Sequence, residues 1–500
     1  MTKIEDKKGD SEHVEMMPDL EHTSTHIDTH HAILSQGHRE YLVERHGTLD
    51  LDPMPQWGNA DPMNWQYWKK LSNLLLVAIS AMLATMNAAA IMPAFAIIAK
   101  DLDIPIPKAA YLTSVQIAVL GVAPLFWRPL SDRYGRRPIW LISSICSMIG
   151  NIGCAYAPNF GSMMACRALV SFFISPAAAI GSGVVTETFF KNERARYMGI
   201  WTLFVTCGVP GGAFLFGFVA NSLDYRWVYR ILAIVNGAQF IAFVFLGPET
   251  RYLRKGVEHQ ESDFKQQYMT FKRIDPTPMS AFDFIQPLTL VKHASIFISA
   301  AAYAMVFLVG GILPSIEIPQ IYAEEFGFNA EQNGLQFIAV IIGSIIGEQM
   351  FGALSDIWMN RRARSLGRRP TPEYRLWLSH IGYALTIVGI VVFLVQLQSA
   401  GKQFNVTPTV GAGIAAVGVQ AVTTVLITYA VDSHQEHAAS IGVFVTFVRQ
   451  TWGFIGPFWF PYMLDNVGMA GSSGVVIALI VSVSVIPTIF LQIRGHSRKT

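Results

Sequence analysis

The sequence has little charge for its length. Only 14% of its 500 residues are Asp, Glu, Lys or Arg, whereas 52% are hydrophobic. A soluble domain of ordinary composition carries about 25% charged residues, so the composition excludes that class. The net charge is only +2, and many of the arginines lie in short loops between hydrophobic runs. We therefore expect no nucleic-acid partner.

Cysteines are few, and the motifs of common enzymes are missing. The sequence has no GxxxxGKS/T loop, which excludes ATP as the energy source. No hydrophobic run contains an HExxH motif or paired aspartates, so the sequence does not predict an enzyme. Thiols inside hydrophobic runs behave as small apolar groups, so we expect neither disulfides nor a metal site. All four cysteines lie in such runs: Cys146, Cys154, Cys166 and Cys207.

Long hydrophobic runs are what the sequence has instead. A helix needs about 20 apolar residues to cross the hydrocarbon core, and twelve segments come near that length. We predict an all-α membrane protein with twelve transmembrane helices in two pseudo-symmetric six-helix bundles. The predicted spans are 71–99, 109–130, 138–157, 162–187, 197–220, 228–247, 292–322, 332–356, 375–398, 409–431, 440–465 and 471–493.

The first sixty residues differ in composition from the rest. They are polar and acidic, and they hold seven of the thirteen histidines at spacings that match no metal-ligand pattern. We interpret them as a solvated tail, with a metal- or pH-sensing tail as the alternative. No hydrophobic segment opens the chain, so we expect no cleavable signal peptide. The predicted parts are a disordered cytoplasmic tail at 1–64, an N-terminal bundle at 65–247, a cytoplasmic central loop at 248–291, a C-terminal bundle at 292–493 and a cytoplasmic tail at 494–500.

An arginine-rich turn between the second and third spans is the most specific feature. The segment WRPLSDRYGRRP, at 127–138, holds four arginines and Asp132 between two membrane-length runs. Gly135 permits a tight bend there. Arginine clusters in short loops stay on the cytoplasmic side of a membrane. The turn therefore places both chain termini in the cytoplasm.

The same pattern occurs again in the second half of the chain. Asp356 ends a hydrophobic run, and Gly-Arg-Arg-Pro follows at 367–370. Glu187 and Asp432 each close the fourth span of their half, where an acid either pairs with the loop arginines or is an ordinary interfacial carboxylate. Two copies indicate an internal duplication, as in many secondary transporters. The predicted cytoplasmic gate consists of Asp132, Gly135, Arg136, Arg137, Glu187, Asp356, Gly367, Arg368, Arg369 and Asp432.

From about residue 65 to 495 the chain resembles the major facilitator superfamily, in particular the fungal twelve-span drug:proton antiporters. PLSDRYGRRP resembles the cytoplasmic loop motif of that family, and Arg167 stands where the family has a membrane arginine linked to proton coupling. Pro248-Glu249-Thr250 resembles fungal members, including a subgroup associated with the uptake of polyamines. The fifth span is similar to the glycine pattern of the antiporters, which lets helices pack closely, at Gly199, Gly208, Gly212 and Gly217.

Polar groups inside the spans are candidates for a transport path, because a lone charge in lipid costs several kcal/mol. Glu348 and Arg449 lie at similar depths, roughly 12 and 14 Å from the inner surface at 1.5 Å per residue. We predict that they face the interior and form an ion pair, either structural or proton-binding. Glu317 lies at the predicted outer mouth. It either attracts a cationic substrate or a proton, or is an ordinary glutamate in contact with water at the interface. The uncharged polar residues in the spans either line the transport path or only make contacts between helices. The predicted pathway is Asn87, Gln116, Arg167, Tyr303, Glu317, Glu348, Gln420, Arg449 and Gln450.

Together these features predict a secondary transporter that needs no cofactor and is driven by the proton gradient. It binds a small organic substrate between the two halves and exposes it alternately to each side of the bilayer. The leading function is efflux of drugs, toxins or secondary metabolites. Uptake of an organic cation such as a polyamine and a non-transporting nutrient sensor are the alternatives. We expect a monomer in the plasma membrane, with the vacuolar membrane as the alternative, and substrate, protons and lipid as its partners.

Overall fold

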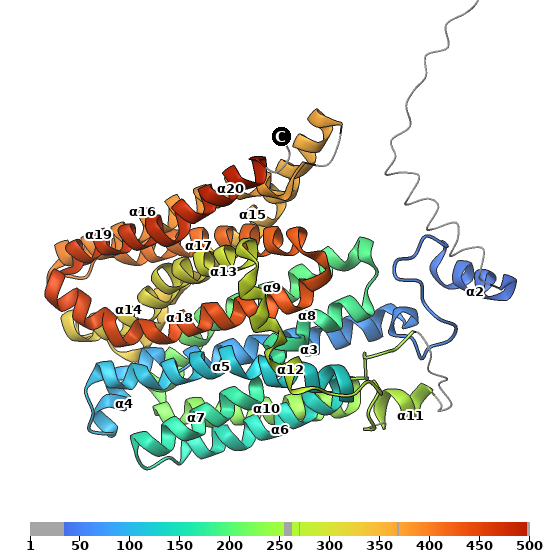
Figure 1. The fold of residues 1–500 in the computed structure, drawn as a ribbon. Coiled ribbons are helices and arrows are strands. Elements are labelled where there is room, and N and C mark those ends of the chain that lie inside the picture. The colour runs from blue at the N-terminus through green and yellow to red at the C-terminus, as the bar shows by residue number, and fades with distance from the viewer. Residues whose placement is uncertain (1–34, 255–262, 270, 368–369, 498–500) are drawn as a thin grey trace, which may run out of the picture.

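The computed structural model describes residues 35–254, 263–269, 271–367 and 370–497. Within these ranges the chain forms helices, turns and loops, and it contains no β-strand. The helices run side by side in an elongated bundle, with the N-terminal half of the chain on one side and the C-terminal half on the other (Figure 1). This arrangement confirms the predicted all-α fold of two helical halves.

The N-terminal half begins at the aromatic residues that precede the first span. Asn159 caps the fourth span through a reciprocal capping box with Ser162, and Pro176 divides that span into two helices, as expected of proline in a first turn. The elements are α3 (Tyr67–Ala89), η2 (Met92–Ala94), α4 (Phe95–Asp101), α5 (Ile106–Tyr134), α6 (Arg136–Ala155), α7 (Phe160–Ile174), α8 (Pro176–Thr188), α9 (Lys191–Ser222) and α10 (Tyr225–Leu246).

The C-terminal half repeats this plan with two widened turns. The π-helical turn η4 (Leu308–Ile312) contains Gly310 and Gly311, and a second π-helical turn, η7 (Val481–Val485), interrupts the last span. The other elements are α13 (Ala294–Phe307), α14 (Leu313–Glu325), α15 (Ala330–Leu366), η5 (Pro372–Leu376), α16 (Trp377–Ala400), α17 (Thr407–Ser433), η6 (Gln435–His437), α18 (Ala438–Val467), α19 (Met469–Ile480) and α20 (Ile486–Ser497).

Eleven helical segments of the described residues are long and apolar enough to cross a membrane. They correspond to all the predicted spans except 440–465. That span corresponds to α18, which carries Arg449 and Gln450 and is not among the eleven. We call the end of the bundle that holds the arginine turns the inner end, and the opposite end the outer end.

Two seams join the halves. Helix α9 packs along α15, and α5 packs along α18. In each seam the second span of one half meets the fifth span of the other, which is the pairing that a two-fold repeat of one half produces. Small residues allow the close approach: a Cβ added to Gly217 of α9 would lie 2.7 Å from the carbonyl oxygen of Ala330.

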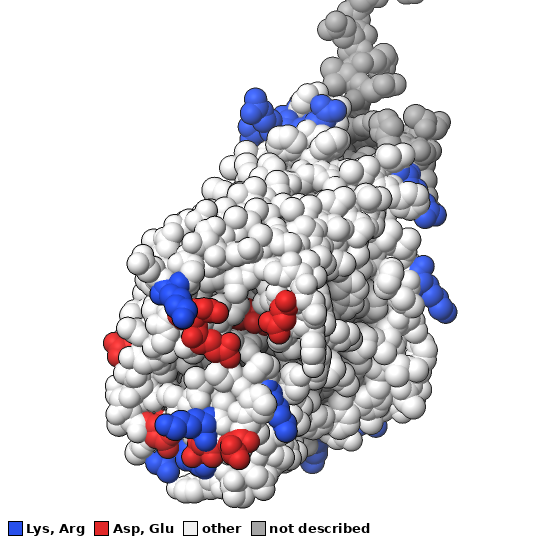
Figure 2. Space-filling view, turned by 90° about the vertical axis from the view of Figure 1, so that its left-hand side faces the viewer, with Lys and Arg blue, Asp and Glu red and all other residues white. Residues whose placement is uncertain are grey.

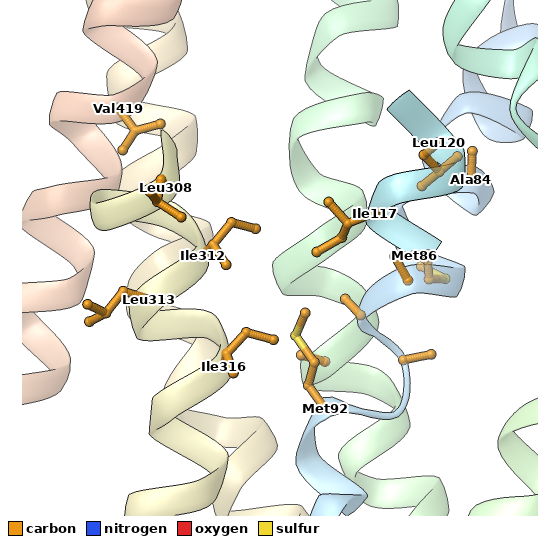
Figure 3. Packing of buried hydrophobic residues seen from close by; sticks show 14 of the residues in the cluster. Ala84, Met86, Met92, Ile117, Leu120, Leu308, Ile312, Leu313, Ile316 and Val419 are labelled. Carbon is orange, nitrogen blue, oxygen red and sulfur yellow. The ribbon is translucent and has the colours of Figure 1, made fainter. Parts of the chain in front are cut away.

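Apolar side chains fill the space between the halves. Ile312 and Ile316 project from η4 and α14 toward Ile117 and Met92 of the N-terminal half (Figure 3), and all four are buried. Tyr111 of α5 and Phe458 of α18 also meet across the interface, with ring centroids 4.6 Å apart. Close packing therefore holds the outer part of the interface together.

The N-terminal tail departs from the prediction of disorder through residue 64. Ser35 caps helix α2 (Gln36–His46), and Asp61 is fully buried. Its carboxylate accepts hydrogen bonds from Arg254 at 2.9 and 3.0 Å. The prediction was wrong for residues 35–64 because their polar groups find partners far along the chain, which a local composition does not reveal. Residues 1–34 lie outside the described ranges.

The central loop folds against the same end of the molecule. Its described elements are α11 (Asp263–Tyr268), α12 (Ala281–Ile285) and η3 (Gln286–Lys292). The guanidinium of Arg133, in the first arginine turn, contacts Asp275 at 2.9 Å and Asp283 at 3.2 Å. Helix α20 runs to Ser497, beyond the predicted end of the last span at 493.

Candidate functional site

Arg136 lies at the centre of an ionic network at the inner end of the first half. Its Nη1 lies 2.8 Å from Oδ1 of Asp132, and its Nη2 lies 2.8 Å from Oε1 of Glu187. The arginine is 6% exposed, and charge-assisted bonds of this length are among the stronger ones in proteins. The structure thus brings three predicted gate residues from α5, α6 and α8 into direct contact.

Glu249, which the sequence analysis left out of the gate, completes this network. It follows α10, is buried, and accepts hydrogen bonds from the backbone N–H groups of Arg136 at 2.8 Å and Arg137 at 2.9 Å. A carboxylate is favourable there because the first N–H groups of a helix are unpaired and carry partial positive charge. Burial raises the pKa of Glu249, and these backbone hydrogen bonds oppose that rise. Its signal in the sequence is the Pro248-Glu249-Thr250 segment.

Gly135 and Arg137 lock the turn to the end of α10. Gly135 has φ of 98°, a backbone conformation that favours glycine. A Cβ at this position would also lie 2.8 Å from Cδ of Glu249. The Arg137 guanidinium donates to the carbonyl oxygens of Phe243 at 2.6 Å and Val244 at 2.9 Å. It therefore satisfies carbonyl groups that the end of a helix leaves free.

A related network stands at the inner end of the second half. Arg375 contacts Asp432 at 3.3 Å and Asp356 at 3.7 Å, and it donates to the hydroxyl of Ser355. In the first half the corresponding hydroxyl is that of Ser131, 2.8 Å from Nη1 of Arg136.

Arg375, which the predicted gate does not include, is therefore the arginine of the second network among the described residues. The predicted gate arginines of this half are Arg368 and Arg369. Those two residues lie outside the described ranges, and Gly367 ends α15 with φ of 63°. The repeated Leu-Ser-Asp triplet locates the acid and the hydroxyl in both halves. It does not locate the arginine, because the spacing to the arginine differs between the copies.

Arg167 is buried in the first half and joins several helices. It donates to the carbonyl oxygen of Leu112 at 2.8 Å, to Oε1 of Gln116 at 2.5 Å and to the hydroxyl of Tyr229 at 3.2 Å. No carboxylate of the described residues forms an ion pair with it. Neutral acceptors therefore carry this buried charge, and two predicted pathway residues, Arg167 and Gln116, lie in contact.

The predicted ion pair between Glu348 and Arg449 does not form. Arg449 donates to the hydroxyl of Tyr303 at 3.0 Å and lies 4.8 Å from the ring centroid of Phe307. Glu348 is half-buried on α15, where it acts electrostatically on Cys207 of α9. The prediction was wrong because equal depth in the membrane does not make two helices neighbours: α15 packs along α9 and α17, whereas α18 packs along α5 and α13. Arg449 instead meets Tyr303, another predicted pathway residue.

The remaining polar candidates have different neighbours. The side-chain amide of Asn87 donates to Leu83 of its own helix. Gln450 packs against Gly121 and so belongs to the α5–α18 seam. Gln420 packs against Gly347 within the second half. Glu317 is 3% exposed, and its Oε1 has no hydrogen-bond partner.

The predicted packing glycines of α9 divide into two groups. Gly208 and Gly212 lie against Met82 and Met86 of α3, and Gly217 lies against α15. Gly199 has open space around its Cα, so it takes no part in close helix packing in this structure.

A cavity of about 130 Å³ lies between the halves at the inner end. Its lining includes Arg128 and Asp132 of the first turn, Asp283 of α12 and Ser440 of α18. The cavity therefore lies beside the first network, where α5, the central loop and α18 meet.

The fold and these networks define an integral, multi-pass membrane protein built of two related halves. The family model of the Major Facilitator Superfamily matches residues 77–457. The chain belongs to this superfamily. It is accordingly a transporter and not an enzyme, and transporters of this family generally need no cofactor.

Several curated fungal transporters are similar to the chain over most of its length. The efflux pump vrtL of Penicillium aethiopicum is 26% identical over 466 residues, which cover 88% of this chain and 92% of the pump. The MFS transporter cpaT of Aspergillus oryzae is 26% identical over 456 residues, covering 88% and 90%. An uncharacterized transporter of Schizosaccharomyces pombe is 24% identical over 443 residues, covering 87% and 90%.

Among solved structures, the peptide transporter POT in complex with alafosfalin has a similar fold. Its TM-score is 0.61 at 14% sequence identity, over 86% of this chain and 96% of that one. A likeness at this identity concerns the fold alone.

Proposed function

We propose that the protein exports small organic compounds across the membrane in exchange for protons. The observation that carries the proposal is the pair of matching ionic networks, centred on Arg136 and Arg375, at the inner ends of the two halves. Each network ties the inner ends of several helices of one half together. Two rigid halves that meet in glycine-lined seams suit the rocking motion by which secondary transporters alternate access.

Export is favoured by the names of the relatives, several of which are efflux pumps. The interface between the halves is apolar and aromatic, with isolated polar groups such as Gln450, which packs against Gly121 of α5. Pockets of this character suit small organic molecules, since a few polar groups fix the orientation of a largely apolar ligand. Proton coupling is supported by two carboxyl groups in the spans, Glu317 and Glu348, neither of which has an ion-pair partner among the described residues.

The test is accumulation of a panel of fluorescent and radiolabelled organic compounds in cells with and without the gene, at two external pH values. Export in exchange for protons predicts lower accumulation of some compounds in cells that have the gene. The difference is expected to grow at the lower external pH, where the inward proton gradient is larger. Higher accumulation would indicate uptake instead, and equal accumulation of every compound at both pH values would contradict transport.

A fluorescent fusion will show whether the protein resides in the plasma membrane, as we propose, or in the vacuolar membrane.

A further inference from the structure

Acidic side chains gather at the outer end of the second half. Glu324 and Glu325 lie at the end of α14, and Asp465 lies near the end of α18; all three are exposed. Figure 2, which views the outer end of the bundle, shows acidic groups around a recess on this face. An acidic cluster by itself is a common surface feature, but this one stands over a buried carboxyl group.

Glu317 lies below this cluster on the same helix. It precedes Glu324 by seven residues, which places the two side chains on one face of α14 and about 10 Å apart along the axis. Glu317 is 3% exposed, and its Oε1 has no hydrogen-bond partner. Gln320, between them, donates its amide to Ile316 rather than to Glu317. A buried, unpartnered carboxyl group thus stands behind an exposed acidic surface.

The charges around Glu317 are all of one sign. The groups that act electrostatically on it are Glu324 of its own helix and Asp465 of α18, and no Lys, Arg or His of the described residues does so. A carboxylate buried without a donor or a cation is costly in a low-dielectric interior. The negative charge of this carboxylate must therefore be neutralised by a bound cation or by a proton. A metal ion does not fit, since the described residues contain no cluster of three or more ligands able to hold one.

The helix that carries Glu317 lies where the two halves meet. Helix α14 contacts η2, α4 and α5 of the first half as well as α18 of the second. It begins directly after the π-helical turn η4, and such turns are frequent at functional sites. A change in the charge of Glu317 therefore acts on the outer contact between the halves.

We propose that Glu317 takes up the transported proton from the outer side, with Glu324 and Asp465 forming the entrance that draws cations toward it. A hydronium ion at the entrance gives its proton to the Glu317 carboxylate and leaves as water. The neutral carboxyl group then remains in the apolar interface while the halves move, and it loses the proton to water at the inner side. This inference depends on the proposed proton-coupled transport and assigns its coupling acid.

The first test observes the proton directly and needs no substrate. Full-length protein in liposomes is examined by infrared difference spectroscopy after a pH jump, in the carbonyl region of protonated carboxyl groups. Besides any band from Glu249 or Glu348, which are also buried or half-buried, we expect a carboxyl band that is lost in Glu317→Gln. The same band should be retained in Glu325→Gln, which removes the same charge from a neighbouring exposed position. Glu317→Asp, which keeps a carboxyl group, should retain a shifted band if it folds. A wild-type band in Glu317→Gln would overturn the proposal.

The second test concerns the entrance. Glu324→Gln combined with Asp465→Asn should retain the Glu317 band but slow its appearance after the pH jump by about tenfold, because charge steering raises association rates by roughly 10–1,000-fold. An unchanged rate would overturn the role of these two acids.

In vesicles loaded with a compound that the wild-type protein transports, Glu317→Gln should lose flux driven by a pH gradient. Gradient-driven flux at the wild-type rate in Glu317→Gln would contradict this inference and leave proton-coupled export intact. Wild-type flux without pH dependence would contradict proton-coupled export itself.

Discussion

Gly135 shows how a single residue can determine the geometry of the inner gate. Its φ of 98° ends α5 and starts α6 without an intervening loop. This sharp turn directs the first N–H groups of α6 at the carboxylate of Glu249 and places Arg136 between Asp132 and Glu187. A side chain at position 135 would conflict both with the backbone angle and with Glu249.

Replacing Gly135 with alanine should destabilise the protein and reduce transport. The cost is at least about 1 kcal/mol for the unfavourable φ, with an added cost for displacing the Glu249 carboxylate. The matched control is Gly199→Ala in α9, where the added methyl group meets open space and helix propensity improves by up to about 1 kcal/mol. Apparent melting temperature in detergent checks both variants. Equal melting temperatures for the two variants would contradict the role given to Gly135.

At the scale of elements, the inner end of α17 has an unusual set of neighbours. His434 ends this helix, and its ring centroid lies 4.8 Å from that of His293, which precedes α13. The ring centroid of His437 lies 5.9 Å from that of His293. Burial lowers the pKa of His434, and the charge of His293 lowers it further, while Glu436 acts in the opposite direction. The folded protein therefore favours the neutral form of His434.

This lowered pKa predicts a loss of stability in acid. The unfolded chain binds a proton at His434 more readily than the folded protein, so stability falls as the pH decreases through about 6.5, the ordinary value for histidine. His434→Gln removes this titration. We expect the drop in apparent melting temperature between about pH 7.5 and about pH 5.5 to be smaller in the variant, by about 1 °C or less, because solvent screens the partly exposed ring. An identical drop in both proteins would show that His434 does not contribute.

At the scale of the whole molecule, the α9–α15 seam determines how closely the halves approach at the outer end. Gly217 and Gly334 face each other there, and a Cβ on Gly334 would lie 3.0 Å from the carbonyl oxygen of Ala213. Asn221 of α9 adds a hydrogen bond of 3.1 Å to Glu331 of α15. The contact is backbone against backbone, so it cannot yield by rotating a side chain.

Replacing Gly217 with valine should therefore reduce transport by pushing the halves apart. Overpacking of a tight contact costs about 1–3 kcal/mol, and the cost applies only to the conformation in which this seam is closed. Gly352→Val, also in a seam helix but with open space around its Cα, should transport nearly as well as the wild type. Initial transport rates in vesicles, normalised to the amount of inserted protein, check the pair. A Gly217→Val variant with the wild-type rate would show that the seam opens and closes elsewhere.

The sequence by itself determined the class of protein and its internal repeat. Hydrophobic runs of membrane length predict helices, because no other single segment satisfies its backbone polar groups in lipid. The two Leu-Ser-Asp turns locate matching acids, and the chemistry of arginine and carboxylate predicts that they pair. These inferences need only the order of residues along one or two neighbouring segments.

Only the tertiary structure decided which distant groups meet. It placed Glu249 on the α6 terminus, brought Arg375 into the second network and joined Asp61 to Arg254 of the central loop. It also paired Arg449 with Tyr303 rather than with Glu348. Most of these outcomes depend on contact between segments more than a hundred residues apart. Arg375 has nearer partners, and its contacts depend on how the neighbouring helices pack. Burial and neighbouring charge, which single out Glu317, are likewise properties of the packed bundle rather than of the residue order.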